Sequence, residues 1–325
     1  MGLFSRAAIL ACAAVFIAQA LPAAAQGYPS KAVRFVVPFA PGGQSDVVAR
    51  LVGQELSRRW GQPVVVDNKP GAATTIGNAM VAQAPADGHT LLLSPAPFVI
   101  TQYACAKLPY DGRADFSPVA LMVTNPMVLV VNPARVAARN VADFIAEAKR
   151  KGGEFAYATP GNGSLPHLGV ELFKVQAGFD ALHVPYKGGG PAVVDLVAGQ
   201  VAFMFASPLE VMQHVKSGKL AVLGVTSAQR LPYWPDVATF KESGAGDYEA
   251  YAWFGVVVRS GTPKDVVERL NADIVAVLRS PEVSQRLTAL GTDVTAGSTQ
   301  DFARFLEAEH QRWSAAVKAA KLTMN

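Results

Sequence analysis

The sequence predicts an α/β fold, and three observations indicate it. Short apolar runs, typical of buried strands, alternate with segments whose apolar residues recur at helical spacing. Half of the residues are hydrophobic and 17% are charged, which is the composition of a globular chain. Glycine-rich turns join an expected strand to an expected helix at three places. Strands separated by helices are typical of parallel sheets, so we expect parallel sheets.

The first half of the chain supplies these elements in turn. Residues 33–38 form an apolar run interrupted only at Arg34, which predicts a strand. A helix ending at Gly61 is expected next, because apolar residues recur at its spacing: Val47, Val48, Leu51, Val52 and Leu56. Strands are then expected at residues 62–67, 90–93 and 127–131, and a helix rich in small residues at 141–149.

The second half continues the alternation. A strand at residues 155–158 precedes a helix with the apolar face Leu168, Leu172 and Phe173. Residues 191–197 are expected to be helical, because Pro191 opens the segment and Gly199 follows it. Strands are expected at residues 201–205, 220–225 and 254–258, a helix from Pro263, and a C-terminal helix from about Thr299 with Phe302, Phe305 and Leu306 on one face.

The first 25 residues have the layout of a secretory signal. Arg6 precedes an apolar run over residues 7–20, and Leu21-Pro22-Ala23-Ala24-Ala25 supplies small residues for cleavage. The run is shorter than the roughly 20 residues of a membrane-spanning helix. We expect cleavage after Ala25 and a mature periplasmic protein. A lipoprotein signal at Ile9-Leu10-Ala11-Cys12 is the alternative, although it would cut the apolar run short.

Removal of the leader leaves 300 residues with a net charge of +3, enough for two domains of about 150 residues each. This mild basicity comes without a basic tail or a block of like charges, so we expect no nucleic-acid partner. The charge is compatible with attracting an anion. Cys105 is then the single cysteine and is expected to be a small buried or half-buried side chain, without a disulfide.

Two strand-to-helix turns repeat one pattern. Val37-Pro38-Phe39-Ala40-Pro41-Gly42-Gly43 and Val184-Pro185-Tyr186-Lys187-Gly188-Gly189-Gly190 both read Val-Pro-aromatic, two variable residues, then glycines before a helix. A third turn, Thr159-Pro160-Gly161-Asn162-Gly163-Ser164, ends in a good helix N-cap. Because the free N–H groups of a helix start attract anions, these turns are candidate anion-binding loops.

Residues for catalysis or metal binding are not grouped in the sequence. No two of the five histidines are three or four residues apart: His89, His167, His183, His214 and His310. The sequence also has no Gly-x-Ser-x-Gly motif. We therefore expect no enzyme, no metal and no cofactor. Asp46 has two interpretations, an acid that stabilises its helix start or a contact for a ligand ammonium or hydroxyl. Trp253 and Phe254 belong either to a cleft or to the core.

The order of the motifs resembles the Bug family, the TctC-like periplasmic receptors of tripartite tricarboxylate transporters. The motifs that carry the resemblance cover the mature chain: Tyr28-Pro29-Ser30-Lys31, residues 35–43 with Asp46 and Ala49-Arg50, Gly61-Gln62-Pro63-Val64-Val65-Val66, Asn68-Lys69-Pro70-Gly71-Ala72, Pro85-Ala86-Asp87-Gly88, Leu108-Pro109-Tyr110-Asp111, Asp115-Phe116-Ser117-Pro118-Val119, Gly161-x-Gly163-Ser164 before His167-Leu168, His183-Val184-Pro185-Tyr186-Lys187-Gly188, Trp253-Phe254-Gly255 and Gly261-Thr262-Pro263.

This resemblance implies a two-lobed type II periplasmic-binding fold with two crossovers, near Asn125 and Tyr251. Residues 26–125 and 252–325 would form the first lobe, and residues 126–251 the second. It implies a monomeric solute-binding protein that captures a small carboxylate in the interlobe cleft and delivers it to the membrane subunits of such a transporter.

The resemblance and the three turns together give the expected ligand-binding residues. A carboxylate would lie between the turn at residues 39–43 and the start of the helix after Ser164. The expected set is Phe39, Ala40, Pro41, Gly42, Gly43, Asp46 and Ser94 in the first lobe, and Thr159, Gly161, Asn162, Gly163, Ser164, His167, Tyr186 and Ser207 in the second.

The ligand is expected to be an organic acid without an amine, either aromatic or dicarboxylic. Ala206-Ser207-Pro208 stands where the family usually has an acid or amide after Met-Phe, and an unpaired ammonium is costly to bury. Phe39, Phe98, Tyr186 and Phe205 are expected to line the pocket. Two alternatives remain: an exported enzyme acting on a carboxylated substrate, and a sensory protein that presents its ligand to a membrane kinase.

Overall fold

The computed structural model describes residues 27–161, 164–186, 188–227, 229–245, 248, 250–289, 291–319 and 323. The expected signal sequence, with either cleavage site, lies outside the described residues. Over the described ranges, no helix is both long and apolar enough to cross a membrane.

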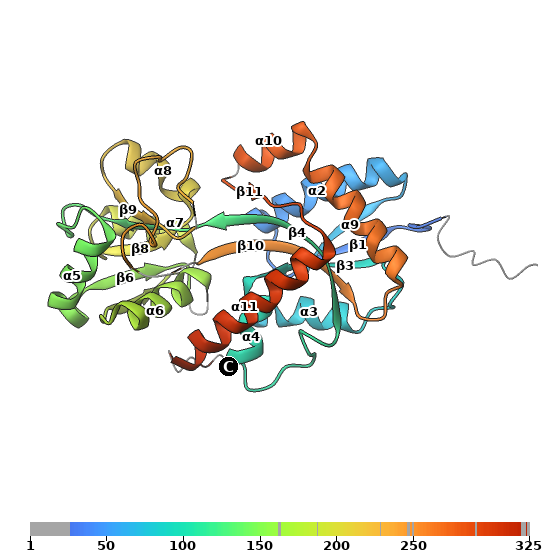
Figure 1. Cartoon of the computed structure of the whole chain (residues 1–325), viewed down its shortest axis with the longest axis horizontal. Coiled ribbons are helices and arrows are strands. Elements are labelled where there is room, and N and C mark those ends of the chain that lie inside the picture. The colour runs from blue at the N-terminus through green and yellow to red at the C-terminus, as the bar shows by residue number, and fades with distance from the viewer. Residues whose placement is uncertain are drawn as a thin grey trace, which may run out of the picture.

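Two separate sheets form the two lobes (Figure 1). The first sheet has the strand order β11-β4-β10-β3-β1-β2. Its strands are β1 (Val33–Val37), β2 (Val64–Asn68), β3 (Thr90–Pro95), β4 (Phe116–Pro126), β10 (Tyr251–Arg259) and β11 (Asp293–Val294). Its helices are α2 (Gln44–Trp60), α3 (Thr75–Ala82), α4 (Ala96–Ala104), α9 (Lys264–Leu278), α10 (Pro281–Ala289) and α11 (Thr299–Ala319), with a 3-10 turn η2 (Ala72–Thr74) before α3.

The second sheet has the order β7-β6-β8-β5-β9 and is built from the middle of the chain. Its strands are β5 (Val128–Val131), β6 (Ala156–Thr159), β7 (Leu182–Pro185), β8 (Phe203–Ala206) and β9 (Ala221–Val225). Its helices are α5 (Val141–Lys151), α6 (Leu165–Ala177), α7 (Gly189–Val197) and α8 (Pro208–Lys216), with a 3-10 turn η3 (Gly152–Glu154) after α5.

Most predicted elements are confirmed, and the arrangement of the strands is partly different. Strands β1, β2 and β3 pair in parallel, as do β6, β7 and β8. The expectation of parallel sheets is wrong for β10, which runs antiparallel to β3 and β4, and for β5, which runs antiparallel to β8 and β9. The reason is the double crossover, because β4 leaves the first lobe where β10 returns. Helices α3, α4, α8 and α10 and strands β4 and β11 were not predicted, whereas β7 is the strand expected before the Val184-Pro185 turn.

The crossovers bring two sheet edges close together. Pro126 at the end of β4 pairs with Tyr251 at the start of β10. Phe254 pairs with Pro95, so the parallel strands of the first sheet end about three residues, or roughly 10 Å, from this point. In the second sheet Val128 pairs with Ala206, so β8 ends about two residues away. The helices that follow these strands therefore begin at edges that face each other.

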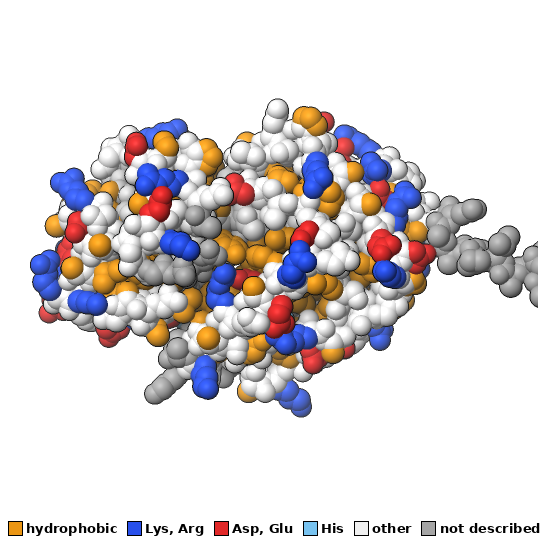
Figure 2. Space-filling model, in the orientation of Figure 1, with side chains coloured by type: hydrophobic (Ala, Val, Ile, Leu, Met, Phe, Trp, Pro, Cys, Tyr) orange, Lys and Arg blue, Asp and Glu red, His pale blue; other side chains and the backbone are white. Residues whose placement is uncertain are grey.

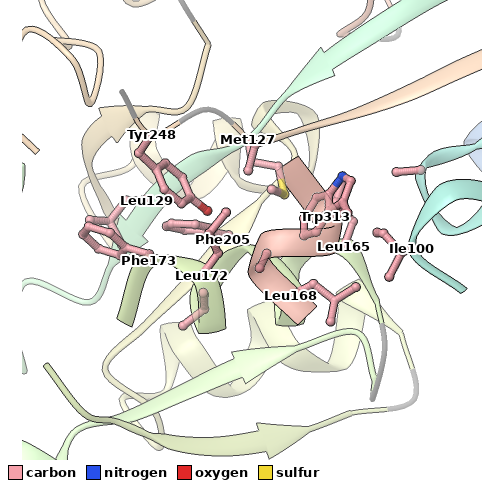
Figure 3. Packing of buried hydrophobic residues seen from close by; sticks show 14 of the residues in the cluster. Ile100, Met127, Leu129, Leu165, Leu168, Leu172, Phe173, Phe205, Tyr248 and Trp313 are labelled. Carbon is pink, nitrogen blue, oxygen red and sulfur yellow. The ribbon is translucent and has the colours of Figure 1, made fainter. Parts of the chain in front are cut away.

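The apolar core continues from one lobe to the other (Figure 3). Trp313 of α11 and Ile100 of α4 lie beside Leu165 and Leu168 of α6, and all four belong to one buried cluster. The buried Glu309 carboxylate accepts hydrogen bonds from the indoles of Trp253 (2.7 Å) and Trp313 (3.0 Å). Trp253 is thus a core residue, and α11 joins the first lobe to the second.

We expect Gly255→Ala to destabilise the protein, because the new Cβ would fall against the ring of Phe302 from α11. Overpacking of this kind costs about 1–3 kcal/mol. Gly153→Ala is the matched control, since a Cβ there has no atom within 4 Å. Urea unfolding followed by circular dichroism measures both. Equal unfolding midpoints for the two variants would contradict the close packing of α11 on β10.

Candidate functional site

The first candidate loop connects β1 to α2. Residues 40–43 are exposed, and Gly42 has φ +86°, a conformation that favours glycine. Gly43 is the N-cap of α2, and no side chain caps this helix start. The first N–H groups of α2 therefore point toward the edge that faces the second lobe, where they suit an anion.

Asp46 holds this loop in place. Its carboxylate accepts hydrogen bonds from the Gly42 N–H (3.0 Å), from Arg50 Nε (2.9 Å) and from Asn68 Nδ2 (2.9 Å). The same Asn68 amide donates to the carbonyl of Phe39 at 3.1 Å. The hydrogen bond from Arg50 lowers the pKa of Asp46 to about 2. Because both of its oxygens are engaged, we interpret Asp46 as the residue that fixes the turn.

Two further helix starts belong to this edge. The turn before α3 contains three consecutive non-glycine residues with positive φ, at 45°, 49° and 80°: Ala72, Ala73 and Thr74. Such backbone strain is typical of functional turns. At the end of β3, Ser94 is fully buried, and its hydroxyl has no hydrogen-bond partner among the residues that the structure describes. Pro95 caps α4 without a side-chain bond. Helices α3 and α4 thus also present uncapped N-termini among the described residues.

In the second lobe the two candidate loops are joined to each other. The Tyr186 N–H donates to the Thr159 carbonyl, and the Gly188 N–H donates to the Pro160 carbonyl, both at 2.9 Å. Ser164 caps α6: its hydroxyl accepts the His167 N–H at 3.4 Å and donates to the Gly161 carbonyl at 2.7 Å. Asn162, Gly163 and Lys187 lie outside the described residues.

The other expected residues of this lobe have partners of their own. The Tyr186 hydroxyl donates to Asp195 at 2.7 Å, and burial raises its pKa to about 12. The Ser207 N–H donates to Glu210 at 3.2 Å at the start of α8. His167 lies stacked on His183. Thr159 is fully buried, so its hydroxyl lies inside the loop.

The structure thus places the expected residues in two groups, one at each of the facing sheet edges. Phe39–Gly43, Asp46 and Ser94 belong to the first edge, and Thr159, Gly161, Ser164, His167, Tyr186 and Ser207 to the second. Figure 2 shows that the surface is indented between the lobes, with charged side chains scattered over this face.

Sequence reasoning missed several residues that shape these edges. Asn68, Arg50 and His183 hold the loops, and Asn125 in the crossover donates to Gln44 of α2 at 3.1 Å. The Oδ1 atom of Asn125 is buried and has no hydrogen-bond partner in the part of the chain that the structure describes. Asn125 lies 81 residues from Gln44, and Asn68 lies 22 from Asp46, so no local pattern could have joined them.

A surface pocket at the opposite edge of the second sheet lies at the end of a helix and not at a helix start. It is lined by Asn132, Arg135, Gly199 and Lys219, among others. Helix α7 ends there at Val197, and helix C-termini carry partial negative charge. The positive helix ends lie at the edges that face each other.

The bond between Asp46 and Arg50 predicts a pH-dependent stability. Because the pKa of Asp46 is lower in the folded protein than the ordinary 3.8, its stabilisation is present above pH 3.8 and is lost as the pH falls toward 2. We expect Asp46→Asn to lower the free energy of unfolding by about 2 kcal/mol at pH 7 and by about half of that at pH 3. Urea unfolding at both pH values measures this. The control is Asp265→Asn, an exposed acid in the first turn of α9. An equal stability difference between wild type and Asp46→Asn at both pH values would contradict the ion pair.

Comparison with known proteins places the chain among binding proteins. The profile described as "Tripartite tricarboxylate transporter family receptor", TctC, matches residues 48–322. A UPF0065 protein from the tcbD-tcbE intergenic region of Pseudomonas sp. strain P51 is 38% identical over 299 residues, 92% of this chain and 89% of its own. Protein BugT of Bordetella pertussis is 37% identical over 315 residues, 95% of this chain and 96% of its own.

Comparison with solved structures leads to the same group of proteins. R. palustris Rpa4515 with adipate has a TM-score of 0.78 at 34% identity and covers 91% of this chain and 99% of its own. MatC from Rhodopseudomonas palustris with bound malate has a TM-score of 0.75 at 32% identity, covering 89% of this chain and all of its own. The likeness confirms the two-lobed periplasmic-binding fold expected from the sequence. The chain therefore belongs to the TctC family of tripartite tricarboxylate transporter receptors.

Proposed function

We propose that this receptor captures a small organic acid between its two lobes in the periplasm and delivers it to the membrane subunits of a tripartite tricarboxylate transporter. The observation that carries the proposal is the gathering of helix N-termini at the two facing edges. Helices α2, α3 and α4 begin at one edge, and α6, α7 and α8 at the other. The partial positive charges of the α2, α3, α4 and α6 starts add up where an anion would lie, while Glu210 offsets those of α7 and α8.

The carboxylate is proposed to lie between the Pro41-Gly42-Gly43 turn and the start of α6 after Ser164. The α2 start lacks a side-chain cap, and the α6 start is capped by a neutral hydroxyl. Neither cap brings a negative charge to the position of the ligand. Contacts from both lobes are needed for binding to favour closure, since a ligand shifts an equilibrium only by its differential affinity.

The lobes are proposed to be residues 26–125 with 252–325, and 126–251, moving about the paired ends of β4 and β10. The pairing of Pro126 with Tyr251 supports this division. The Thr226 hydroxyl also accepts the Met127 N–H at 3.0 Å and donates to the Ala250 carbonyl, so it links the two crossover segments.

Apolar side chains at the edges favour a ligand with an apolar body. Val47 in α2, Ile76 in α3 and Leu209 in α8 are 39%, 51% and 48% exposed, and each lies in the first turn of its helix. The expectation that Phe98 and Phe205 line the pocket is wrong, because both are fully buried in the core. Two neighbours, with adipate and with malate, support a dicarboxylate as the class to test first.

Ser164 provides a test of the carboxylate position. Asp is a good N-cap, so Ser164→Asp should preserve α6 while adding a negative charge where the ligand carboxylate is proposed to lie. We expect at least about a 100-fold loss of affinity, because two carboxylates about 4 Å apart repel strongly at a partly buried site. Ser164→Asn, which has the same shape without the charge, is the control and should lose less than about 5-fold. Calorimetric titration with adipate and malate measures both, and equal affinities of the two variants would remove the carboxylate from this position.

A matched pair of acids tests the ligand class. We expect succinate to bind more tightly than aspartate, because Asp46 is already engaged by three donors and cannot serve an ammonium without loss. A thermal-shift screen detects the difference, since a ligand at 100 times its dissociation constant adds about 2.7 kcal/mol. Tighter binding of aspartate would contradict the expectation. If Glu210→Gln then abolished it, the ammonium would be assigned to Glu210 at the start of α8.

A further inference from the structure

Three aromatic rings are stacked beneath the Gly161 turn of the second lobe. Tyr157 and His183 are register partners on β6 and β7, and their rings lie 5.0 Å apart at 24°. On the other side of His183, the ring of His167 from the first turn of α6 lies 4.0 Å away at 13°. His183 is therefore held between a strand residue and the helix that begins at the proposed carboxylate position.

Inside this stack, His183 makes a short hydrogen bond to Thr159. His183 Nε2 lies 2.6 Å from the Thr159 hydroxyl, which is fully buried. The same hydroxyl oxygen is 3.3 Å from both the N–H and the carbonyl oxygen of Gly161. Thr159 thus connects His183 to the backbone of the turn that precedes Ser164.

The hydroxyl has one hydrogen, so its direction can be assigned from the distances. The Gly161 N–H can only donate to the Thr159 oxygen. The hydrogen of Thr159 is then directed either to the Gly161 carbonyl at 3.3 Å or to His183 Nε2 at 2.6 Å. The shorter contact has the length of a strong hydrogen bond and the longer one is at the limit. An Nε2–H that donated to the same oxygen would leave the Thr159 hydrogen only the 3.3 Å contact, so acceptance by Nε2, with the proton of a neutral ring on Nδ1, satisfies these groups better.

The surroundings keep the ring neutral. Burial, together with the neighbouring His167, lowers the pKa of His183 to about 4, and burial also lowers the pKa of His167. Glu171, which acts in the opposite direction, is engaged by the Tyr157 hydroxyl and by Lys174 at 2.9 Å. Lys174 also pairs with Asp180 at 3.2 Å. Of these charged groups, Glu171 and Lys174, both on α6, act on the two imidazoles.

We propose that His183 is a positioning residue of the carboxylate loop, in which its neutral imidazole accepts the Thr159 hydrogen bond and so fixes the Gly161 turn ahead of α6. The inference rests on the proposed function, because the turn matters only if a ligand binds there. A polar ring between Tyr157 and His167 loses hydration on burial, and the bond to Thr159 offsets that loss. An apolar ring would fill the same space without orienting the turn.

A double-mutant cycle tests the coupling. His183→Phe retains the ring plane and removes the acceptor, and Thr159→Val removes the hydroxyl with little change of shape. We expect each single variant to bind adipate or malate about 10-fold more weakly, and the double variant to be no weaker than either, because one hydrogen bond is lost in all three. His183→Gln, which brings back an acceptor, should recover most of the affinity. His214→Phe, at the far end of α8, controls for loss of a histidine.

Nuclear magnetic resonance of ¹⁵N-labelled histidine gives a second readout. In the wild-type protein the His183 ring should carry its proton on Nδ1 with a bare Nε2 from pH 8 to pH 6, and this signal should change in Thr159→Val. A protonated Nε2 would overturn the assignment of the bond. Unchanged affinity of the single variants, or additive losses, would overturn the positioning role. If the wild-type protein binds neither acid, the proposed ligand class is at fault, while the spectrum still decides the state of His183.

Discussion

The antiparallel pairing of β4 with β10 is the constraint on which the rest of the structure depends. The ladder runs from Phe116 beside Arg259 to Pro126 beside Tyr251, with two irregularities in register within β10. Each strand continues directly into the second lobe, so the two sheets are joined at one place by two adjacent backbones. Because the parallel strands of each sheet end only a few residues from that place, the helices that follow them are forced to begin facing each other.

The same pairing limits how the lobes can move. Helix α11 packs against α4 and reaches α6, so the core is continuous on one side of the hinge. On another side, a Cβ on Gly291 would lie 3.6 Å from the Cβ of Leu209 in α8. Burial, together with the carboxylate of Asp293, raises the pKa of Tyr233 to about 12, so a charge of the first lobe acts on a side chain of the second. When the lobes open, Leu209 of α8 must move away from Gly291. The apolar packing of α11 against α4 and α6 would lose stability if it were exposed to water.

The sequence was sufficient for elements defined by local patterns and insufficient for those defined by distant contacts. The periodicity of Val48, Val52 and Leu56 predicts α2, and the glycines after β1 predict the exposed turn. Strand β4 was missed, because most of its residues are buried on both faces of the sheet and therefore show no alternation of apolar and polar residues. For Asp46, neither partner was predicted: Arg50 lies only four residues away, but Asn68 lies 22 residues away, and Asn68 ties the acid to the Phe39 carbonyl.

The charges near the helix starts differ between the two lobes, and this difference affects how a dicarboxylate would lie. In the first lobe, the Asp46 charge is balanced by Arg50, so the uncapped starts of α2, α3 and α4 keep their attraction for an anion. In the second lobe, a Cβ on Gly189 would collide with the carboxylate of Glu210, so this acid already lies at the start of α7. Burial raises the pKa of Glu210, the direction expected where a carboxylate lacks sufficient compensation. A second ligand carboxylate at the start of α7 would be repelled by the carboxylate of Glu210. The charges therefore favour one carboxylate at α6 and the other directed toward the first lobe.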